Sequence, residues 1–296
     1  MGAELLSAVY PLRYLGTAEE LLERALPRWW GRAIQALFLS QVRELDAGLA
    51  AELHEPGQAR PYTVSGLIGY RGPESLSDGS ALSFRVTALR EDVRAALVRL
   101  SEAGGGFSAG ARIALDYLPF EVLPREAGVS LAEERSYADL IAAGMSLAAR
   151  AQIDFRFRSP TLFKSEGKTQ PLPLPALVFR SLLERWNAFS PLAFPEDTFR
   201  FAEECVAVSG FSLRTFPAEL GENALRIGAV GKVRYRALNP DRYWISILHS
   251  LARFSAFSGI GAGTAYGLGQ AGPILPRLGP KPQRGDSENK RTLTIE

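Results

Sequence analysis

Two histidines are the first candidates for proton-transfer chemistry in this sequence of 296 residues. His54 stands at the end of a predicted short helix and opens the loop HEPGQARP. A histidine side chain gives or takes a proton near neutral pH, and loops often display catalytic side chains. His54 is therefore a candidate acid–base residue; the alternative is a surface histidine between Glu52 and Glu55. His249 falls among apolar residues of the last predicted helix, which favours a structural role.

A glycine-rich segment is the strongest local pattern. Between Gly259 and Gly269, five of eleven residues are glycine. Glycine adopts positive φ and lets a backbone approach a ligand closely, so such a loop suits phosphate groups. The segment lacks the Lys-Ser/Thr pair of a P-loop, and it follows a helix and precedes a strand, the reverse of the dinucleotide-binding order. The alternative is a structural turn that packs the helix end on the sheet. The candidate ligand contacts are Gly259, Gly261, Gly263, Thr264, Gly267 and Gly269.

Basic residues concentrate in the second half of the chain. Residues 1–149 carry 14 basic and 19 acidic side chains, whereas residues 150–280 carry 16 basic and 10 acidic ones. Arginine outnumbers lysine by 29 to 5, which suits bidentate phosphate contacts but also fits a GC-rich genome. Basic residues two apart on a strand share one face, which would either bind phosphates or be solvated. The candidates are Arg156 and Arg158 on one strand, Lys164 and Lys168 in a loop, and Lys232, Arg234 and Arg236 on another strand.

Composition excludes several classes of protein. Cys205 is the only cysteine, so an internal disulfide and a cysteine zinc site are excluded. No basic segment followed by an apolar run opens the sequence, and no stretch of about 18 apolar residues occurs. We therefore expect a cytoplasmic protein with neither a signal peptide nor a membrane span. Apolar residues make up 46% of the chain, enough for buried cores.

Apolar spacing in the first half predicts the order strand, helix, strand, strand, helix, strand. Period-2 patterns indicate strands, and apolar residues three or four apart indicate helices. The expected strands are 7–15, 61–70, 81–89 and 111–122, and the expected helices are 27–45 with a short continuation at 47–53, and 91–103.

The second half repeats that order. Its expected strands are 151–158, 204–216, 225–238 and a short one ending near Leu275, with helices at 175–189 and 240–255 and a hairpin turn at 221–223. The sequence therefore predicts an α+β fold of two tandem ferredoxin-like βαββαβ domains with an RRM-like topology. We expect a first domain over 1–145, a second domain over 146–278 that includes the glycine-rich loop, and a polar, disordered tail over 279–296.

Three segments carry a resemblance to a known family. They are FSGIGAGTAYGLGQ at residues 257–270, LAAELHEPGQARPYTVSGL at 49–67 and FRFRSPTLFKSEGKTQPLPLPALVFRSLLERWN at 155–187. The first resembles the C-terminal glycine-rich loop of the repeat-associated (RAMP) CRISPR proteins. The second and third resemble the N-terminal segment and the start of the second domain of the CRISPR repeat-RNA processing endoribonucleases, the Cas-six family. The segment around His54 is the one that favours the nuclease.

The resemblance implies cleavage of CRISPR precursor RNA within its repeats, by attack of a 2′-hydroxyl on the adjacent phosphate, with neither metal nor other cofactor. His54 would be the general base or acid, and Arg60 would neutralise the charged phosphorane. Relatives often have a lysine near that position, and some add a tyrosine from the first long helix. No tyrosine occurs between residues 27 and 53 here. The candidates for that role are Ser40, Gln41, Tyr62 and Ser65.

The resemblance also implies that precursor and mature repeat RNA contacts the glycine-rich loop and the second domain, where Tyr266 could stack on a base. Subunits of a CRISPR effector complex and a second copy of the chain are further partners in this antiviral defence, with no membrane involved. A noncatalytic RAMP-type subunit that binds guide RNA is the main alternative. It would bind repeat RNA without cleavage that depends on His54. A small-molecule enzyme that uses the loop as a phosphate cradle is a more distant alternative.

Overall fold

The structure is a computed structural model that describes residues 2–22, 26–55, 57–124, 132–165, 167–220 and 224–274. The expected tail at 279–296, the turn at 221–223 and the strand end near Leu275 lie outside these residues. Among the helices of the described ranges, none combines the length and the apolar character needed to span a membrane.

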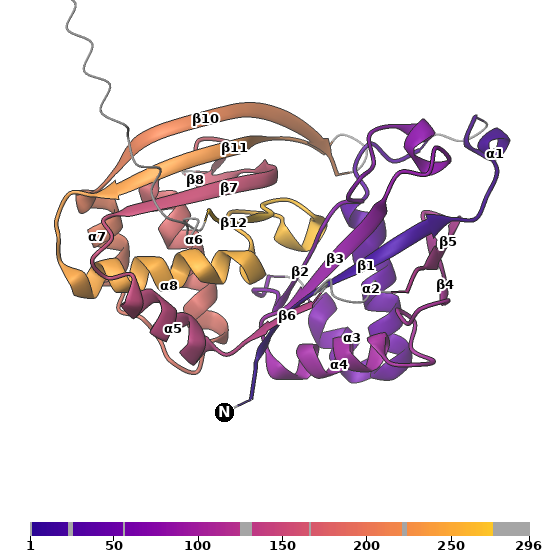
Figure 1. Ribbon diagram of the computed structural model, residues 1–296, viewed down its shortest axis with the longest axis horizontal. Helices are drawn as coiled ribbons and strands as arrows, with labels where there is room; N and C mark the ends of the chain where they lie inside the picture. The colour runs from indigo at the N-terminus through magenta and orange to yellow at the C-terminus, as the bar shows by residue number, and fades with distance from the viewer. Residues whose placement is uncertain are drawn as a thin grey trace, which may run out of the picture.

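A mostly antiparallel sheet organises the first half (Figure 1). Its strand order is β2-β3-β1-β5-β4, with β6 also pairing with β1. The central strand is thus the first one in the chain, as in a ferredoxin-like βαββαβ unit. The strands are β1 (Leu5–Tyr14), β2 (Tyr62–Val64), β3 (Leu82–Ala88), β4 (Arg112–Leu115), β5 (Leu118–Val122) and β6 (Ala132–Arg135).

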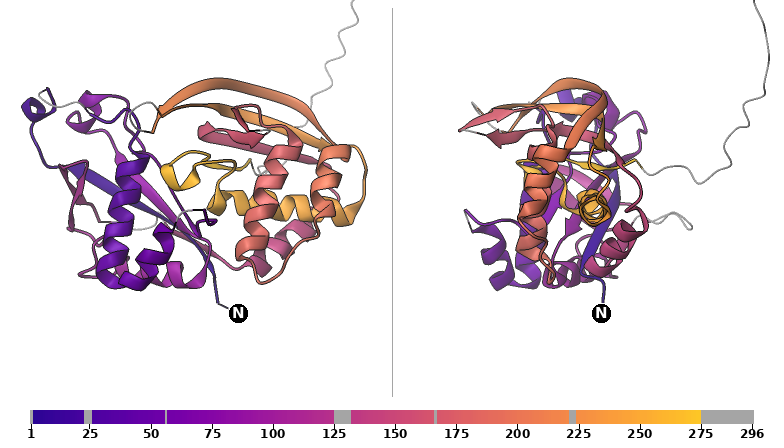
Figure 2. Two further views of the ribbon diagram at one scale, coloured as in Figure 1. Left: turned by 180° about the vertical axis from the view of Figure 1, so that it is seen from behind. Right: turned by 90° about the vertical axis from the view of Figure 1, so that its left-hand side faces the viewer.

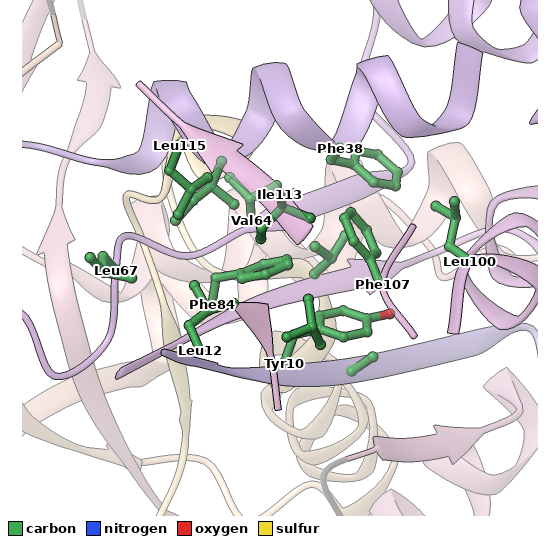
Figure 3. Close-up of a cluster of buried hydrophobic side chains, with 14 of the residues drawn as sticks. Tyr10, Leu12, Phe38, Val64, Leu67, Phe84, Leu100, Phe107, Ile113 and Leu115 are labelled. Atoms are coloured by element: carbon green, nitrogen blue, oxygen red, sulfur yellow. The ribbon is translucent and has the colours of Figure 1, made fainter. Parts of the chain in front are cut away.

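Helices cover one face of this sheet and close the first core. Figure 3 shows Tyr10 of β1 and Phe84 of β3 beneath Phe38 of the long helix. The ring centroids of Tyr10 and Phe84 are 4.9 Å apart, and Phe107 lies 4.9 Å from Tyr10. The helices are α1 (Ala18–Leu22), α2 (Gly31–Leu45), α3 (Ala47–His54), the short η1 (Pro73–Leu76) and α4 (Glu91–Ser101).

The second half repeats the plan with strand order β10-β11-β7-β12. Figure 2 shows its long β10–β11 ribbon arching toward the first half. The strands are β7 (Gln152–Thr161), β10 (Val206–Glu219), β11 (Leu225–Ala237) and β12 (Ala271–Pro273), with β8 (Phe163–Ser165) and β9 (Lys168–Gln170) as a separate hairpin. The helices are α5 (Tyr137–Ser146), α6 (Pro175–Phe189), α7 (Asp197–Cys205), α8 (Arg242–Ser258) and the short η2 (Thr264–Tyr266).

Hydrophobic periodicity explains why these elements form where they do. Alternate residues of β7, among them Phe155 and Phe157, are buried, as a strand with one covered face requires. Val178, Leu182 and Trp186 recur every fourth residue and form the buried stripe of α6. The predicted tandem ferredoxin-like α+β fold is confirmed.

Several sequence-based boundaries are corrected by the structure. The expected strand 111–122 is a hairpin, β4 and β5, whose turn at Asp116 and Tyr117 has positive φ. Only residues 62–64 of the expected strand 61–70 form a regular strand. Lys164 and Lys168, expected in a loop, lie in β8 and β9. The patterns also missed α1, β6, α5 and α7, which are short or carry few apolar residues.

The two halves share apolar packing near the point where the chain crosses between them. β6 belongs to the first sheet, whereas Tyr137 and Leu140 of α5 belong to the second core. Leu5 and Leu89 of the first half also pack in that second core. The change from one core to the other therefore falls at Ser136, which caps α5 with a capping box.

Candidate active site and nucleic-acid interface

The glycine-rich loop leaves α8 at Gly259 and lies between the two halves. All five of its glycines have positive φ, as predicted, with values between 63° at Gly259 and 84° at Gly267. A Cβ at Gly261 would overlap the backbone of Leu162, and one at Gly267 would lie 2.8 Å from the Gly66 nitrogen. The glycines therefore serve both the turn geometry and close packing of backbone against backbone.

Much of this loop is satisfied by the protein itself. The N–H of Gly261 donates to Ser181 Oγ at 2.8 Å, and that of Gly269 donates to the Pro160 carbonyl at 3.0 Å. The N–H of Gly259 continues the α8 pattern by donating to Ser255. Arg185, which is buried, donates to the carbonyls of Ser258 and Gly261. A ligand at these three glycines would have to use groups other than their N–H donors.

The loop also contacts the first half directly. Trp29 Nε1 donates to the Tyr266 carbonyl at 2.6 Å, and Gly267 forms a parallel bridge with Ser65. Gln270 Nε2 donates to the Val64 carbonyl at 2.8 Å. These contacts fix the loop against β2 and the start of α2. Gly263 is half-buried and Thr264 is buried within this arrangement.

Arg85 of β3 is a buried link between the halves that the sequence patterns missed. Its guanidinium donates to the Ala256 carbonyl at 2.7 Å and to Gln270 Oε1. Burial lowers its pKa to about 10, and the nearby Arg158 contributes in the same direction. The alternating strand pattern places Arg85 opposite the first core, and that face is covered by the end of α8. No sequence signal identifies such a partner, because it comes from the other half of the chain.

His54 is the last residue of α3. Asp46 caps this helix by accepting from the N–H of Leu49 at 2.9 Å, and Leu53 turns into the first core. His54 itself is exposed, and among the described residues it has no hydrogen bond or ion pair. Its neighbour Glu52 pairs with Arg90 at 2.8 Å. The imidazole is thus presented to solvent at the end of a helix that is firmly packed on the sheet.

Arg60 is half-buried and is connected to the glycine-rich loop. Its Nη1 donates to Tyr62 Oη at 2.9 Å, and the same hydroxyl accepts from Gln35 Nε2 at 2.9 Å. The guanidinium carbon lies 5.7 Å from the centre of the Tyr266 ring, within cation–π range. The structure therefore joins Arg60 and Tyr266 from opposite halves, but it shows no contact between Arg60 and His54.

The other candidates for a supporting catalytic role differ in accessibility. Ser65 Oγ is engaged, because it donates to the Gly66 carbonyl and accepts from the N–H of Arg85. Tyr62 is buried under Arg60. On α2, Gln41 donates to Glu44 at 3.3 Å, and Ser40 is half-buried. Tyr62 is thus the member of this group in contact with a predicted catalytic residue.

Basic side chains share the outer face of the second sheet. Lys232 of β11 lies directly opposite Arg156 of β7, and Arg236 lies opposite Gln152. Their buried neighbours point to the helices, so these side chains point away from them. Arg234 instead pairs with Asp154 at 2.9 Å. Arg158 is on the same face, and its pKa is lowered by partial burial and by Arg156.

The loop lysines form a separate, smaller basic group. Lys164 and Lys168 are exposed on the two strands of the β8–β9 hairpin, which follows β7 directly. Lys168 lies opposite Ser165, and Lys164 lies opposite Thr169. The second half thus presents basic groups both on its outer sheet face and on this hairpin.

Comparison with known proteins supports the sequence resemblance. Residues 155–271 match the family described as CRISPR-associated endoribonuclease Cas6, and this range excludes His54. A protein of that description from Mycobacterium tuberculosis is 32% identical over 126 residues, 41% of this chain. The match spans only 39% of the length of that relative.

Solved structures resemble nearly the whole chain. A Cas6 (TTHA0078) product complex has a TM-score of 0.73 and 28% identity, covering 92% of this chain and 99% of the other. Thermus thermophilus Cas6 (TTHB231) has a TM-score of 0.66 and 26% identity, covering 93% and 100%. An RAMP protein binding different RNA substrates, 16% identical with a TM-score of 0.55 and coverage of 91% and 100%, shares the fold. The predicted resemblance is confirmed.

Proposed function

We propose, from the similarity of this chain to Cas6 endoribonucleases in both sequence and fold, that it cleaves CRISPR precursor RNA within the repeats to release guide RNAs. The observation that carries this proposal is the match to a Cas6 product complex, which extends over 92% of the chain. The exposed His54 and the cation Arg60 stand in the first half, and basic surfaces stand in the second, as this function needs.

The proposed reaction is an internal transesterification. A base takes the proton of a 2′-hydroxyl, the 2′-oxygen bonds to the adjacent phosphorus, and the bond from phosphorus to the 5′-oxygen breaks. An acid protonates that departing oxygen, so the products are a 2′,3′-cyclic phosphate and a 5′-hydroxyl. His54 acts as the base or the acid. Arg60, held by Tyr62, stabilises the extra negative charge on phosphorus.

RNA binding is assigned to the second half and the loop beside Arg60. The outer sheet face offers Lys232, Arg236 and Arg156 to phosphates, with Arg158 alongside. Lys164 and Lys168 extend this surface along the β8–β9 hairpin. The glycine-rich loop contributes mainly by fixing Tyr266 next to Arg60, where a base could stack on the ring.

The activity is tested with His54→Ala and the repeat RNA encoded beside the gene, in the presence of a chelator. Loss of the imidazole should slow cleavage by about 10²–10⁴-fold, because general acid–base catalysis contributes that much. RNA affinity should stay within about twofold. The control is Gln58→Ala, a neutral change in the same exposed loop. The 5′-hydroxyl of the product is identified by direct labelling with a polynucleotide kinase.

Two results would contradict the proposal in different ways. Cleavage by His54→Ala at the full rate would remove His54 from the mechanism. Tight binding of repeat RNA without cleavage by the unaltered protein would instead identify a noncatalytic guide-RNA subunit.

The basic face is tested separately by replacing Lys232, Arg234 and Arg236 with glutamine. Each lost phosphate contact should lower the slope of log affinity against log salt by about 0.7 for single-stranded RNA. Arg234 already pairs with Asp154, so the expected fall is nearer two contacts than three. An unchanged slope would exclude this face from the RNA-binding surface.

A further inference from the structure

A cavity in the second half lies away from the predicted catalytic segment. It has a volume of about 500 Å³ and lies between the loop after α5, the first residues of β7 and one side of α8 (Figure 1). Pro273 and Ile274, at the end of β12, close one edge of it. A volume of this size lies in the range of small-ligand sites.

Positive charge dominates the lining of this cavity. Arg150, Arg236 and Arg253 all contribute to it. Within the described parts of the chain, none of these three arginines has an ion-pair partner. The acidic lining residue, Asp154, is already paired with Arg234 and accepts from Gln152 Nε2 at 2.8 Å. The cavity therefore has cationic groups that no carboxylate of the described chain neutralises.

Two further groups show that the site is built into the fold. Arg253 Nε is buried and has no hydrogen-bond partner among the described residues, which is a costly state for a charged group. His249 is buried with its Nε2 at 2.8 Å from the Arg150 carbonyl oxygen. Burial, with Arg253 and Arg150 nearby, lowers the pKa of His249, as expected in a region already rich in positive charge.

Arg236 connects the cavity to the basic outer face. It lines the cavity and is also the end member of the series Lys232, Arg234 and Arg236 on β11. These alternate residues are spaced roughly 6.6 Å apart along the strand. A polyanion that lies along β11 would therefore reach the cavity at its Arg236 end.

We propose that this cavity binds a phosphate group of single-stranded RNA lying along the outer face of the second sheet. The proposal rests on the proposed function for the identity of the polyanion as RNA. The site is separate from His54 and Arg60, and it holds RNA rather than cleaving it. The shared chemistry is that of a phosphate ester, which arginines bind through charged hydrogen bonds.

The test measures binding of a ten-nucleotide polyuridylate RNA to the full chain carrying His54→Ala, by fluorescence anisotropy. Arg150 is exposed, so Arg150→Gln should fold normally. It is expected to weaken binding about 3–10-fold and to lower the salt slope by about 0.7, the loss of one phosphate contact. Arg253→Gln should act in the same direction.

Arg242→Gln is the matched control, because Arg242 is exposed at the start of α8, about 16 Å along the helix from Arg253. Its affinity should stay within about twofold of the parent. Equal affinities for Arg150→Gln and Arg242→Gln would overturn the proposal. Adenosine monophosphate is titrated in parallel. If it binds the parent and not Arg150→Gln, while RNA binding is unchanged, the site belongs to free nucleotides and the RNA assignment is wrong.

This test is independent of the cleavage experiment. Binding to the cavity is measured in a variant that needs no nuclease activity. A protein that fails to cleave but shows the Arg150 effect would contradict the proposed function alone, and the reverse result would contradict the cavity alone.

Discussion

Gly267 offers a sharp test of how the glycine-rich loop joins the two halves. Its φ is 84°, a conformation that costs alanine about 1–2 kcal/mol. A Cβ there would lie 2.8 Å from the Gly66 nitrogen and 2.9 Å from the Ser65 carbonyl carbon, both backbone atoms of the first half. Neither neighbour can rotate away as a side chain would. Gly267→Ala must therefore displace the loop from β2 or the backbone after β2.

Gly79 supplies the matched control. Its φ is 82°, nearly the same as that of Gly267, but a Cβ there would meet nothing within 4 Å. Gly79→Ala should therefore lower the free energy of unfolding by only about 1–2 kcal/mol, the conformational cost alone. Gly267→Ala adds overpacking of about 1–3 kcal/mol, for a total of roughly 2–5 kcal/mol. The difference between the two variants isolates the contact between the halves.

The assay is urea unfolding followed by tryptophan fluorescence. Trp29 is a suitable reporter because its Nε1 donates to the carbonyl of Tyr266, the residue before Gly267. We expect the emission of Gly267→Ala to change before the main transition, whereas Gly79→Ala keeps a single transition at slightly lower urea. Equal losses of stability in the two variants would refute the argument that the glycine is required by backbone contact across the halves.

Two further predictions concern buried polar groups. Gln270→Ala leaves the Val64 carbonyl and one guanidinium N–H of Arg85 without partners, so it should lower the free energy of unfolding by about 2–4 kcal/mol, against less than about 0.5 kcal/mol for Gln58→Ala. The pKa of His249 is lowered in the fold by burial, so the unfolded chain binds the proton more readily as pH falls below 6.5. The melting temperature should therefore fall between about pH 7 and pH 5, and His249→Gln should reduce that fall; an unchanged pH profile would contradict the buried, neutral assignment.

Strongly periodic segments were predictable from local spacing. The expected helix 175–189 coincides with α6, and the expected strands 81–89 and 225–238 correspond closely to β3 and β11. In each, one face is apolar at the period of the element, so burial itself records the secondary structure. The expected strand 111–122 was wrong in its middle because Asp116 and Tyr117 adopt positive φ without a glycine to announce the turn.

The candidate site was only partly accessible to such reasoning. The placement of His54 at the end of α3 and of alternating basic residues on β7 and β11 follows from local patterns and is present in the structure. The contact of Arg60 with Tyr266 involves residues from opposite halves, so no spacing rule predicts it. The same holds for the cavity at Arg150, Arg236 and Arg253, whose members come from three separate elements.

By itself, the sequence determined the repeated order of strands and helices, the excess of basic groups in the second half and the positive φ of the glycine-rich loop. Each of these depends on neighbours close along the chain. The tertiary structure decided what the loop touches, because its N–H groups, Arg85 and Gln270 find their partners across the boundary between the halves. Buried polar groups need specific partners, and which partners they meet is set only when the two sheets pack together.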